Sequence, residues 1–127
     1  MAEVLTRDQI PVPETWDVES IYKTAADYER EAARLESLAA PILAMRGKLD
    51  VPAKIAEAFK LEDRLTLLIE TLHLYAHMLE DVDTSVGANQ ARMAALRGKL
   101  AKIQGELAWI TPEILGRDEA TLKAWTD

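Results

Sequence analysis

The chain has 127 residues, of which 49% are hydrophobic and 29% are charged, and its formal net charge at pH 7 is −7. This balance predicts one soluble globular domain spanning residues 1–127 and excludes an intrinsically disordered chain. No uncharged run is long enough to cross a bilayer, no segment is basic enough to follow a phosphate backbone, and cysteine is absent. We therefore expect neither a membrane, nor nucleic acid, nor disulfides. The N-terminus lacks the apolar segment of a signal peptide, and we expect the protein in the cytoplasm.

Residues 1–15 are predicted to form an extended N-terminal arm. Pro11 and Pro13 remove backbone donors and restrict the residues before them to extended conformations. The large apolar side chains that follow are expected to hold this arm against the core: Trp16, Ile21 and Tyr22.

The first long helix is predicted over residues 24–45. Thr24 and Asp27 form a variant of the capping box at its start. Pro41 predicts a kink or a new short helix near its end, and Gly47 then ends the element. Apolar residues at alternating steps of four and three define its buried stripe: Tyr28, Ala32, Leu35, Ala39 and Ile42.

The second helix is predicted over residues 50–83 and is the longest. Asp50 and Pro52 mark its start, and the polar side chains of residues 83–85 predict a tight, capped turn into the next helix. Its apolar face is wide enough to meet more than one neighbour. That face consists of Leu61, Leu65, Leu68, Leu72, Tyr75, Leu79 and Val82, widened by Ile55, Phe59, Ile69 and Ala76.

The third helix is predicted over residues 85–110 and is stopped by Pro112. Gly98 and Gly105 share one face of it, where they either admit a close neighbour or are simply tolerated. Its apolar stripe comprises Met93, Leu96, Leu100, Ile103, Leu107 and Ile110.

These elements predict an all-α fold, namely an antiparallel helical bundle of three long helices plus a short C-terminal helix and an extended N-terminal arm. The short helix is expected to begin at Asp118 after a turn. Neither a cap nor a stop signal follows it, so we expect it to be cut off after Asp127.

His73 and His77 are the only histidines, and a helix places both imidazoles on one face. A zinc metallopeptidase uses the related pattern H-E-x-x-H, in which the glutamate is the general base. Here Leu74 occupies the position of that glutamate, and the sequence marks no third ligand. We therefore expect no metal at this pair, with His73 partly buried or at the edge of the apolar face and His77 in solvent.

Other candidate sites lack essential residues. Asp81, Asp83 and Ser85 alternate as in a calcium loop, but Val86 and Arg92 stand where that loop needs glycine and glutamate. No cysteine nucleophile or G-x-S-x-G elbow is present. We therefore predict no catalytic, metal-binding or cofactor-binding residue in this chain. The basic residues that could line an anion pocket fall off the apolar stripes and are expected in solvent: Arg64, Arg92, Arg97 and Lys99.

Several short motifs, taken together, resemble oligoendopeptidase F, although no single one is specific. Their order and spacing agree from about Arg7 to the end of the chain. The motifs are Trp16-Asp17 and Ile21-Tyr22 in "PETWDVESIY", "GKL" at residues 47–49, Tyr75-Ala76 and Asp83-Thr84 in "LYAHMLEDVDT", and "PEIL" at residues 112–115.

The resemblance implies that the chain is the N-terminal helical domain of a zinc metallopeptidase related to thimet oligopeptidase. Such enzymes are mostly helical, enclose a deep channel and cut short peptides. Their H-E-x-x-H helix and third zinc ligand lie C-terminal to this region. Zinc is therefore implied for the parent enzyme but outside this chain, and no catalytic residue can be carried over. The domain would form one wall of the channel and pack against the missing catalytic domain, and its acidic surface would favour basic peptides.

The alternative is a stand-alone helical module that dimerises or binds a partner helix. A small helical enzyme would need a polar cluster inside the bundle, which the sequence does not indicate. Trp109 and Trp125 are either core anchors or contacts to something outside the chain. We expect the apolar surface of the second helix, together with Trp109, Ile110 and Trp125, to be covered by self-association as a two-fold dimer.

Overall fold

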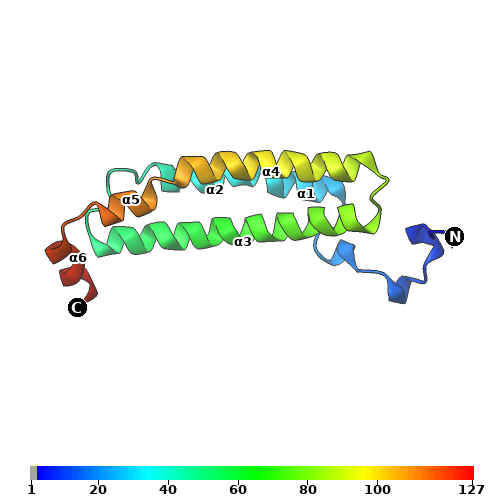
Figure 1. The fold of residues 1–127 in the computed structure, drawn as a ribbon, viewed down its shortest axis with the longest axis horizontal. Coiled ribbons are helices and arrows are strands. Elements are labelled where there is room, and N and C mark those ends of the chain that lie inside the picture. The colour runs from blue at the N-terminus through cyan, green and yellow to red at the C-terminus, as the bar shows by residue number, and fades with distance from the viewer. Residues whose placement is uncertain (1–2) are drawn as a thin grey trace.

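The computed structural model describes residues 3–127, and these residues form six α-helices and three short 3₁₀ helices but no strand (Figure 1). The predicted all-α fold is confirmed. The 3₁₀ helices are Arg7–Gln9, Val12–Glu14 and Val18–Ser20, and the α-helices are α1 (Ala25–Ala32), α2 (Arg34–Leu43), α3 (Pro52–Val82), α4 (Gly87–Leu107), α5 (Ile110–Leu115) and α6 (Glu119–Thr126).

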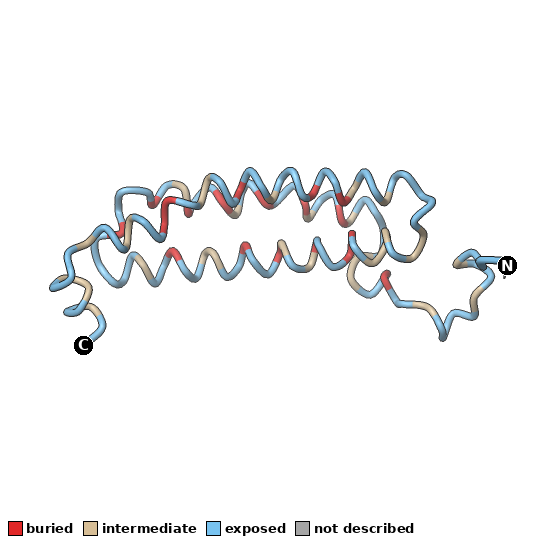
Figure 2. Tube along the Cα trace, in the orientation of Figure 1, coloured by how far each residue is buried: buried red, intermediate tan, exposed pale blue. Residues whose placement is uncertain are grey.

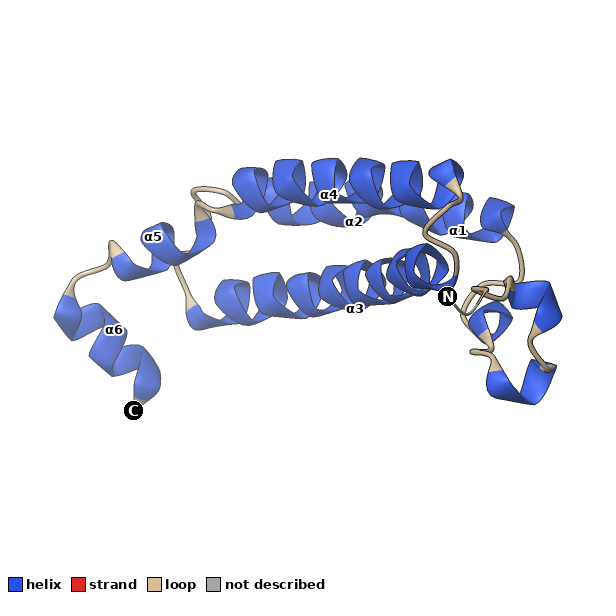
Figure 3. Ribbon diagram, turned by 45° about the vertical axis from the view of Figure 1, so that its right-hand side comes forward, coloured by secondary structure: helices blue, strands red, loops and turns tan. Residues whose placement is uncertain are grey.

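The fold is an elongated bundle in which α3 packs against both α2 and α4 (Figure 1). The chain runs along the bundle through α1 and α2, returns through α3 and runs back through α4, so α3 is antiparallel to its two neighbours. The N-terminal arm lies at the end where α3 turns into α4, whereas α5 and α6 lie at the opposite end, beside the loop between α2 and α3 (Figures 1 and 3).

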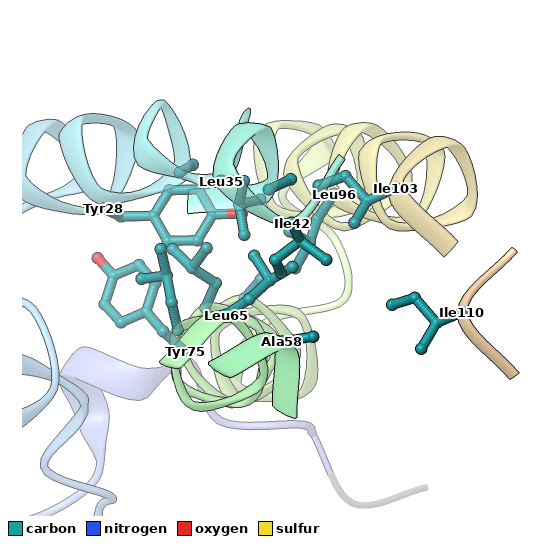
Figure 4. Close-up of a cluster of buried hydrophobic side chains, with 14 of the residues drawn as sticks. Tyr28, Leu35, Ile42, Ala58, Leu65, Tyr75, Leu96, Ile103 and Ile110 are labelled. Atoms are coloured by element: carbon teal, nitrogen blue, oxygen red, sulfur yellow. The ribbon is translucent and has the colours of Figure 1, made fainter. Parts of the chain in front are cut away.

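The three predicted apolar stripes meet along the bundle axis (Figure 2). Every residue of the first stripe is buried, and the close-up shows Leu35 and Ile42 of α2 directed toward α3 (Figure 4). Burial of each large apolar side chain stabilises the fold by ~1.5–3 kcal/mol. The buried members from the other two stripes are Leu65, Leu68, Leu72, Tyr75, Ala76, Met93, Leu96, Ile103 and Ile110.

Three tyrosines from separate segments join this core at the end near the arm. The Tyr28 and Tyr75 rings are nearly parallel, with centroids 5.3 Å apart, and the Tyr22 ring meets both edge-on at 6.1 and 5.2 Å. Such aromatic pairs contribute beyond the area they bury. Burial raises the pKa of the Tyr28 hydroxyl to about 12 and also raises the pKa values of Tyr22 and Tyr75. All three phenols are therefore neutral at pH 7.

The first predicted helix divides at Ala33 rather than at Pro41. Thr24 caps it as predicted, its side-chain oxygen accepting a hydrogen bond from the Asp27 N–H at 3.1 Å. Pro41 lies inside α2, on its exposed side and within one turn of its end. The pyrrolidine ring therefore points away from α3, and the single backbone hydrogen bond that it removes faces solvent. Ala33 itself keeps right-handed helical dihedral angles.

The loop between α2 and α3 is held by α5. Gly47 adopts the left-handed conformation (φ 80°) that favours glycine. The Glu113 carboxylate accepts hydrogen bonds from the Gly47 N–H and from the Leu49 N–H, the latter at 3.1 Å. The Arg117 guanidinium donates to the Leu49 carbonyl at 2.8 Å. Leu49 is fully buried, so these bonds satisfy backbone groups that have left water.

The predicted end of the third helix is wrong. Helix α4 ends at Leu107, and the expected turn around Pro112 is the short helix α5. Pro112 occupies the first turn of α5, where a missing backbone N–H breaks no intrahelical hydrogen bond. The last helix begins as predicted, because the Asp118 side chain caps α6 by accepting from the Thr121 N–H at 2.8 Å.

The N-terminal arm is not simply extended. Two 3₁₀ turns interrupt it, and the Thr6 backbone N–H donates to the Gln9 side chain at 2.8 Å within a reciprocal capping arrangement. The dihedral angle that Pro13 imposes is compatible with such a turn. Arg7 ties the arm together by donating to the Trp16 carbonyl at 2.8 Å. Of the predicted arm, residues 1–2 lie outside the described residues.

Two leucines of α3 test the contribution of the core. Leu72 is fully buried and Leu74 is 51% exposed. We expect Leu72→Ala to lower the free energy of unfolding by about 2–5 kcal/mol, because a cavity remains among the three helices. Leu74→Ala is the matched control and is expected to change it by less than about 1 kcal/mol. Urea unfolding followed by circular dichroism measures both, and equal effects would contradict the described packing.

Alkaline pH tests the tyrosine cluster. Above pH ~10 tyrosines ionise in the unfolded chain, whereas Tyr28 in the folded chain stays neutral until pH about 12. The unfolded state then binds fewer protons, so the free energy of unfolding falls as the pH rises through this interval. Tyr28→Phe keeps the ring and should reduce this loss by on the order of 1 kcal/mol. Urea unfolding of both proteins across this interval is the measurement, and an unchanged slope in the variant would refute the assignment.

Candidate functional site

His73 and His77 lie side by side on the outer face of α3. Their ring centroids are 5.7 Å apart with 25° between the ring planes, and both residues are exposed. Of the two positions expected for His73, partly buried or at the edge of the apolar face, its exposure excludes the first. Nε2 of His77 lies 3.3 Å from Oδ2 of Asp81. Within residues 3–127 no group of three potential metal ligands converges, and Leu74 offers no general base, so the pair does not fit a catalytic zinc site.

The turn between α3 and α4 is stabilised by Asp83. Its Oδ1 accepts hydrogen bonds from the backbone N–H of Ser85 at 3.0 Å and from the Ser85 hydroxyl. These bonds hold the pKa of Asp83 below its ordinary value. The predicted tight turn is present, but α4 begins at Gly87 after Val86 and receives no side-chain cap.

Arg92 differs from the other basic residues that were expected in solvent. Arg64, Arg97 and Lys99 are exposed, whereas Arg92 is half-buried beside Met93. Its guanidinium carbon lies 5.7 Å from the centroid of the Tyr28 ring, a cation–π arrangement. Its Nη1 donates to the Asn89 side chain at 2.9 Å. Arg92 thus packs α4 against α1, and these four residues form no common anion pocket.

Trp109 and Trp125 have different environments. Trp109 is only 8% exposed, and the next residue, Ile110, is also buried. Trp125 in α6 is half-buried. The exposed apolar surface expected around Trp109 and Ile110 is therefore absent, because both side chains pack in the core of their own chain. The large apolar side chains that α3 does expose are Phe59, Leu67 and Leu74.

The outer face of α4 is lined by small side chains. Seven glycines and alanines follow one another at alternating steps of four and three, and all are exposed. A Cβ atom placed on any of the three glycines would have no neighbour within 4 Å. Gly98 and Gly105 therefore admit no close neighbour from within this chain. We call this surface the small-residue face, and it consists of Gly87, Ala91, Ala94, Gly98, Ala101, Gly105 and Ala108.

The motifs that carry the family resemblance meet in pairs across the fold. Glu113 of the "PEIL" motif binds the backbone of the "GKL" motif, as described above. Tyr22 and Tyr75, from two other motifs, have ring centroids 5.2 Å apart. Ala76 is fully buried next to Tyr75. The contacts of these motifs are therefore those of a scaffold.

None of the helices in the described part of the chain is both long and apolar enough to span a bilayer.

Comparison with known proteins identifies two curated relatives. The chain is 25% identical over 118 residues to oligopeptidase PepF of Bacillus subtilis (strain 168), an alignment that covers 92% of this chain and 18% of that protein. It is 28% identical over 125 residues to the plasmid oligoendopeptidase F of Lactococcus lactis subsp. cremoris, covering 94% of this chain and 20% of that protein. No protein-family model and no solved structure matches the chain. The chain thus spans about a fifth of the length of these relatives, and it is related to oligoendopeptidase F along nearly its whole length.

Proposed function

We propose that the chain is a non-catalytic helical domain of an oligoendopeptidase F-like zinc metallopeptidase that hydrolyses short peptides, and that it forms one wall of the substrate channel. The observation that carries this proposal is its similarity, over more than nine-tenths of its length, to two proteins named as oligopeptidases. In the proposed enzyme, zinc is bound outside this region, in the catalytic domain. The enzyme is proposed to be cytoplasmic.

The contacts of the bundle support a structural role. Its motifs connect helices to one another, and its paired histidines lack both a general base and a third ligand. A wall of a channel must keep its shape while peptides of different sequence pass it. The continuous core along α2, α3 and α4 provides that rigidity, and the outer faces of α3 and α4 are free to contact a peptide or another domain.

The gene sequence after codon 127 tests the proposal directly. We expect an H-E-x-x-H motif on a helix downstream, followed by a glutamate that supplies the third ligand. A stop codon directly after Asp127 would instead favour the alternative, a stand-alone interaction module.

The chain alone is expected to have no peptidase activity, with or without added zinc, because Leu74 replaces the general base between the histidines. The measurement is cleavage of a quenched fluorescent oligopeptide by the purified chain, with the His73→Ala variant as control. Zinc-dependent cleavage by the chain that is lost in this variant would overturn the assignment of a non-catalytic role.

The small-residue face favours the second candidate function, a dimerisation module. Small side chains at this spacing let two helices approach closely. The excised domain of a larger peptidase would leave the same face uncovered, so self-association is expected under both functions.

We expect light scattering to show a mass that rises from monomer to dimer with protein concentration. Gly98→Glu places a charge in the middle of the small-residue face and should shift this transition to concentrations at least about tenfold higher. Gln104→Glu adds the same charge at the flank of that face on the same helix and should shift the transition less. A monomeric mass at every concentration, or equal effects of the two substitutions, would exclude this dimer.

A further inference from the structure

A groove runs between α2 and α3 on the side where Leu67 projects from the bundle. Its cavity volume is about 410 Å³, within the range of small-ligand sites. Leu67 is 67% exposed, an unusual position for a leucine at the centre of the longest helix. The groove is lined by Tyr22, Glu31, Arg34, Leu38, Arg64, Leu67, Leu68 and Thr71.

The apolar part of the groove lies between the two helices. Leu38 and Leu68 form its floor, and Leu67 rises beside them. The Thr71 hydroxyl donates to the Leu67 carbonyl at 2.8 Å, so its hydrogen-bond donor is used within α3. This part of the groove therefore matches a bulky aliphatic side chain of a ligand.

The charged part of the groove is positive, although the chain as a whole is negative. On one wall, Nη1 of Arg34 lies 2.7 Å from Oε2 of Glu31, so these two charges offset each other. On the other wall, Arg64 is exposed and forms no ion pair with any described residue. The unpaired guanidinium beside an apolar floor is complementary to a carboxylate next to an aliphatic group.

Tyr22 closes one end of the groove. Burial raises the pKa of its hydroxyl, with a further contribution from Glu31 and an opposing one from Arg34. The phenol is neutral at pH 7 and keeps a hydrogen for donation to a carbonyl or carboxylate oxygen.

We propose that this groove binds an oligopeptide in which an acidic residue stands next to a leucine-like residue, with the carboxylate on Arg64 and the aliphatic side chain beside Leu38 and Leu67. The assignment deepens the proposed function, on which it rests, by naming a class of peptide that the channel wall contacts. It differs from the expectation that the acidic wall favours basic peptides, because the local charge of the groove opposes the net charge of the domain.

The test is a titration of the ¹⁵N-labelled chain with the peptide Ac-Gly-Leu-Glu-Leu-Gly-NH₂, followed by amide chemical shifts. We expect shifts at Leu38, Arg64, Leu67 and Thr71. Replacing the peptide's glutamate by glutamine should weaken binding about tenfold, since one charge-assisted hydrogen bond is lost. Arg64→Gln should weaken it by a similar factor, and Arg97→Gln, an equally exposed arginine on α4, should not.

The inference would be overturned if the peptide did not bind, or if Arg64→Gln left its affinity unchanged. Equal binding of a peptide with lysine in place of glutamate would also overturn it. So would chemical shift changes confined to the arm or to α4. Groove resonances that move with protein concentration alone would assign the groove to a second copy of the chain. Binding is measured without turnover, so its failure is separable from failure of the proposed function. An H-E-x-x-H motif downstream with no peptide binding would reject only the groove assignment.

Discussion

The constraint on which the structure depends is that three amphipathic helices can bury their apolar stripes only against one another. Leu35 on α2, Leu72 on α3 and Met93 on α4 are fully buried within one core. A single helix of this kind would leave its stripe in water, and its own backbone hydrogen bonds would not hold it. Because α3 has the widest apolar face, it lies against both neighbours and fixes their antiparallel directions. The arm and α5 then attach to the two ends of this core.

The contacts at these two ends join the motifs that carry the resemblance to oligoendopeptidase F. Each motif is a few common residues, but "PEIL" and "GKL" are joined by Glu113, and the Tyr22 and Tyr75 rings meet edge-on. Each pair joins segments that are far apart in the sequence. In these segments the motif residues make contacts that hold the fold together.

Periodicity predicted the helices and their buried faces, because burial repeats with the helical turn. The stripe from Tyr28 to Ile42 is buried at every position. Sequence reasoning failed where a residue's effect depends on which side of a helix it faces, or on a distant partner. Pro41 is tolerated within α2 on its exposed side, and Pro112 lies in the first turn of α5 rather than ending α4. The sequence predicts Arg92 in solvent because it falls off the apolar stripe, and nothing local indicates its partner, the Tyr28 ring, which lies on another helix. No local pattern marks the groove between α2 and α3, which exists only after the helices have packed.

The two outward surfaces of the bundle differ in what they can hold. The small-residue face of α4 carries no side chain larger than that of alanine, so it suits a rigid helix lying along it. The groove between α2 and α3 has a floor, a hydroxyl and an unpaired guanidinium, so it suits a flexible segment that places one side chain at a time. His73 and His77 belong to neither surface and are exposed on the outer side of α3. One face for a neighbouring helix and one groove for a peptide would suit the channel wall that we propose, because such a wall would be fixed on one side and selective on the other.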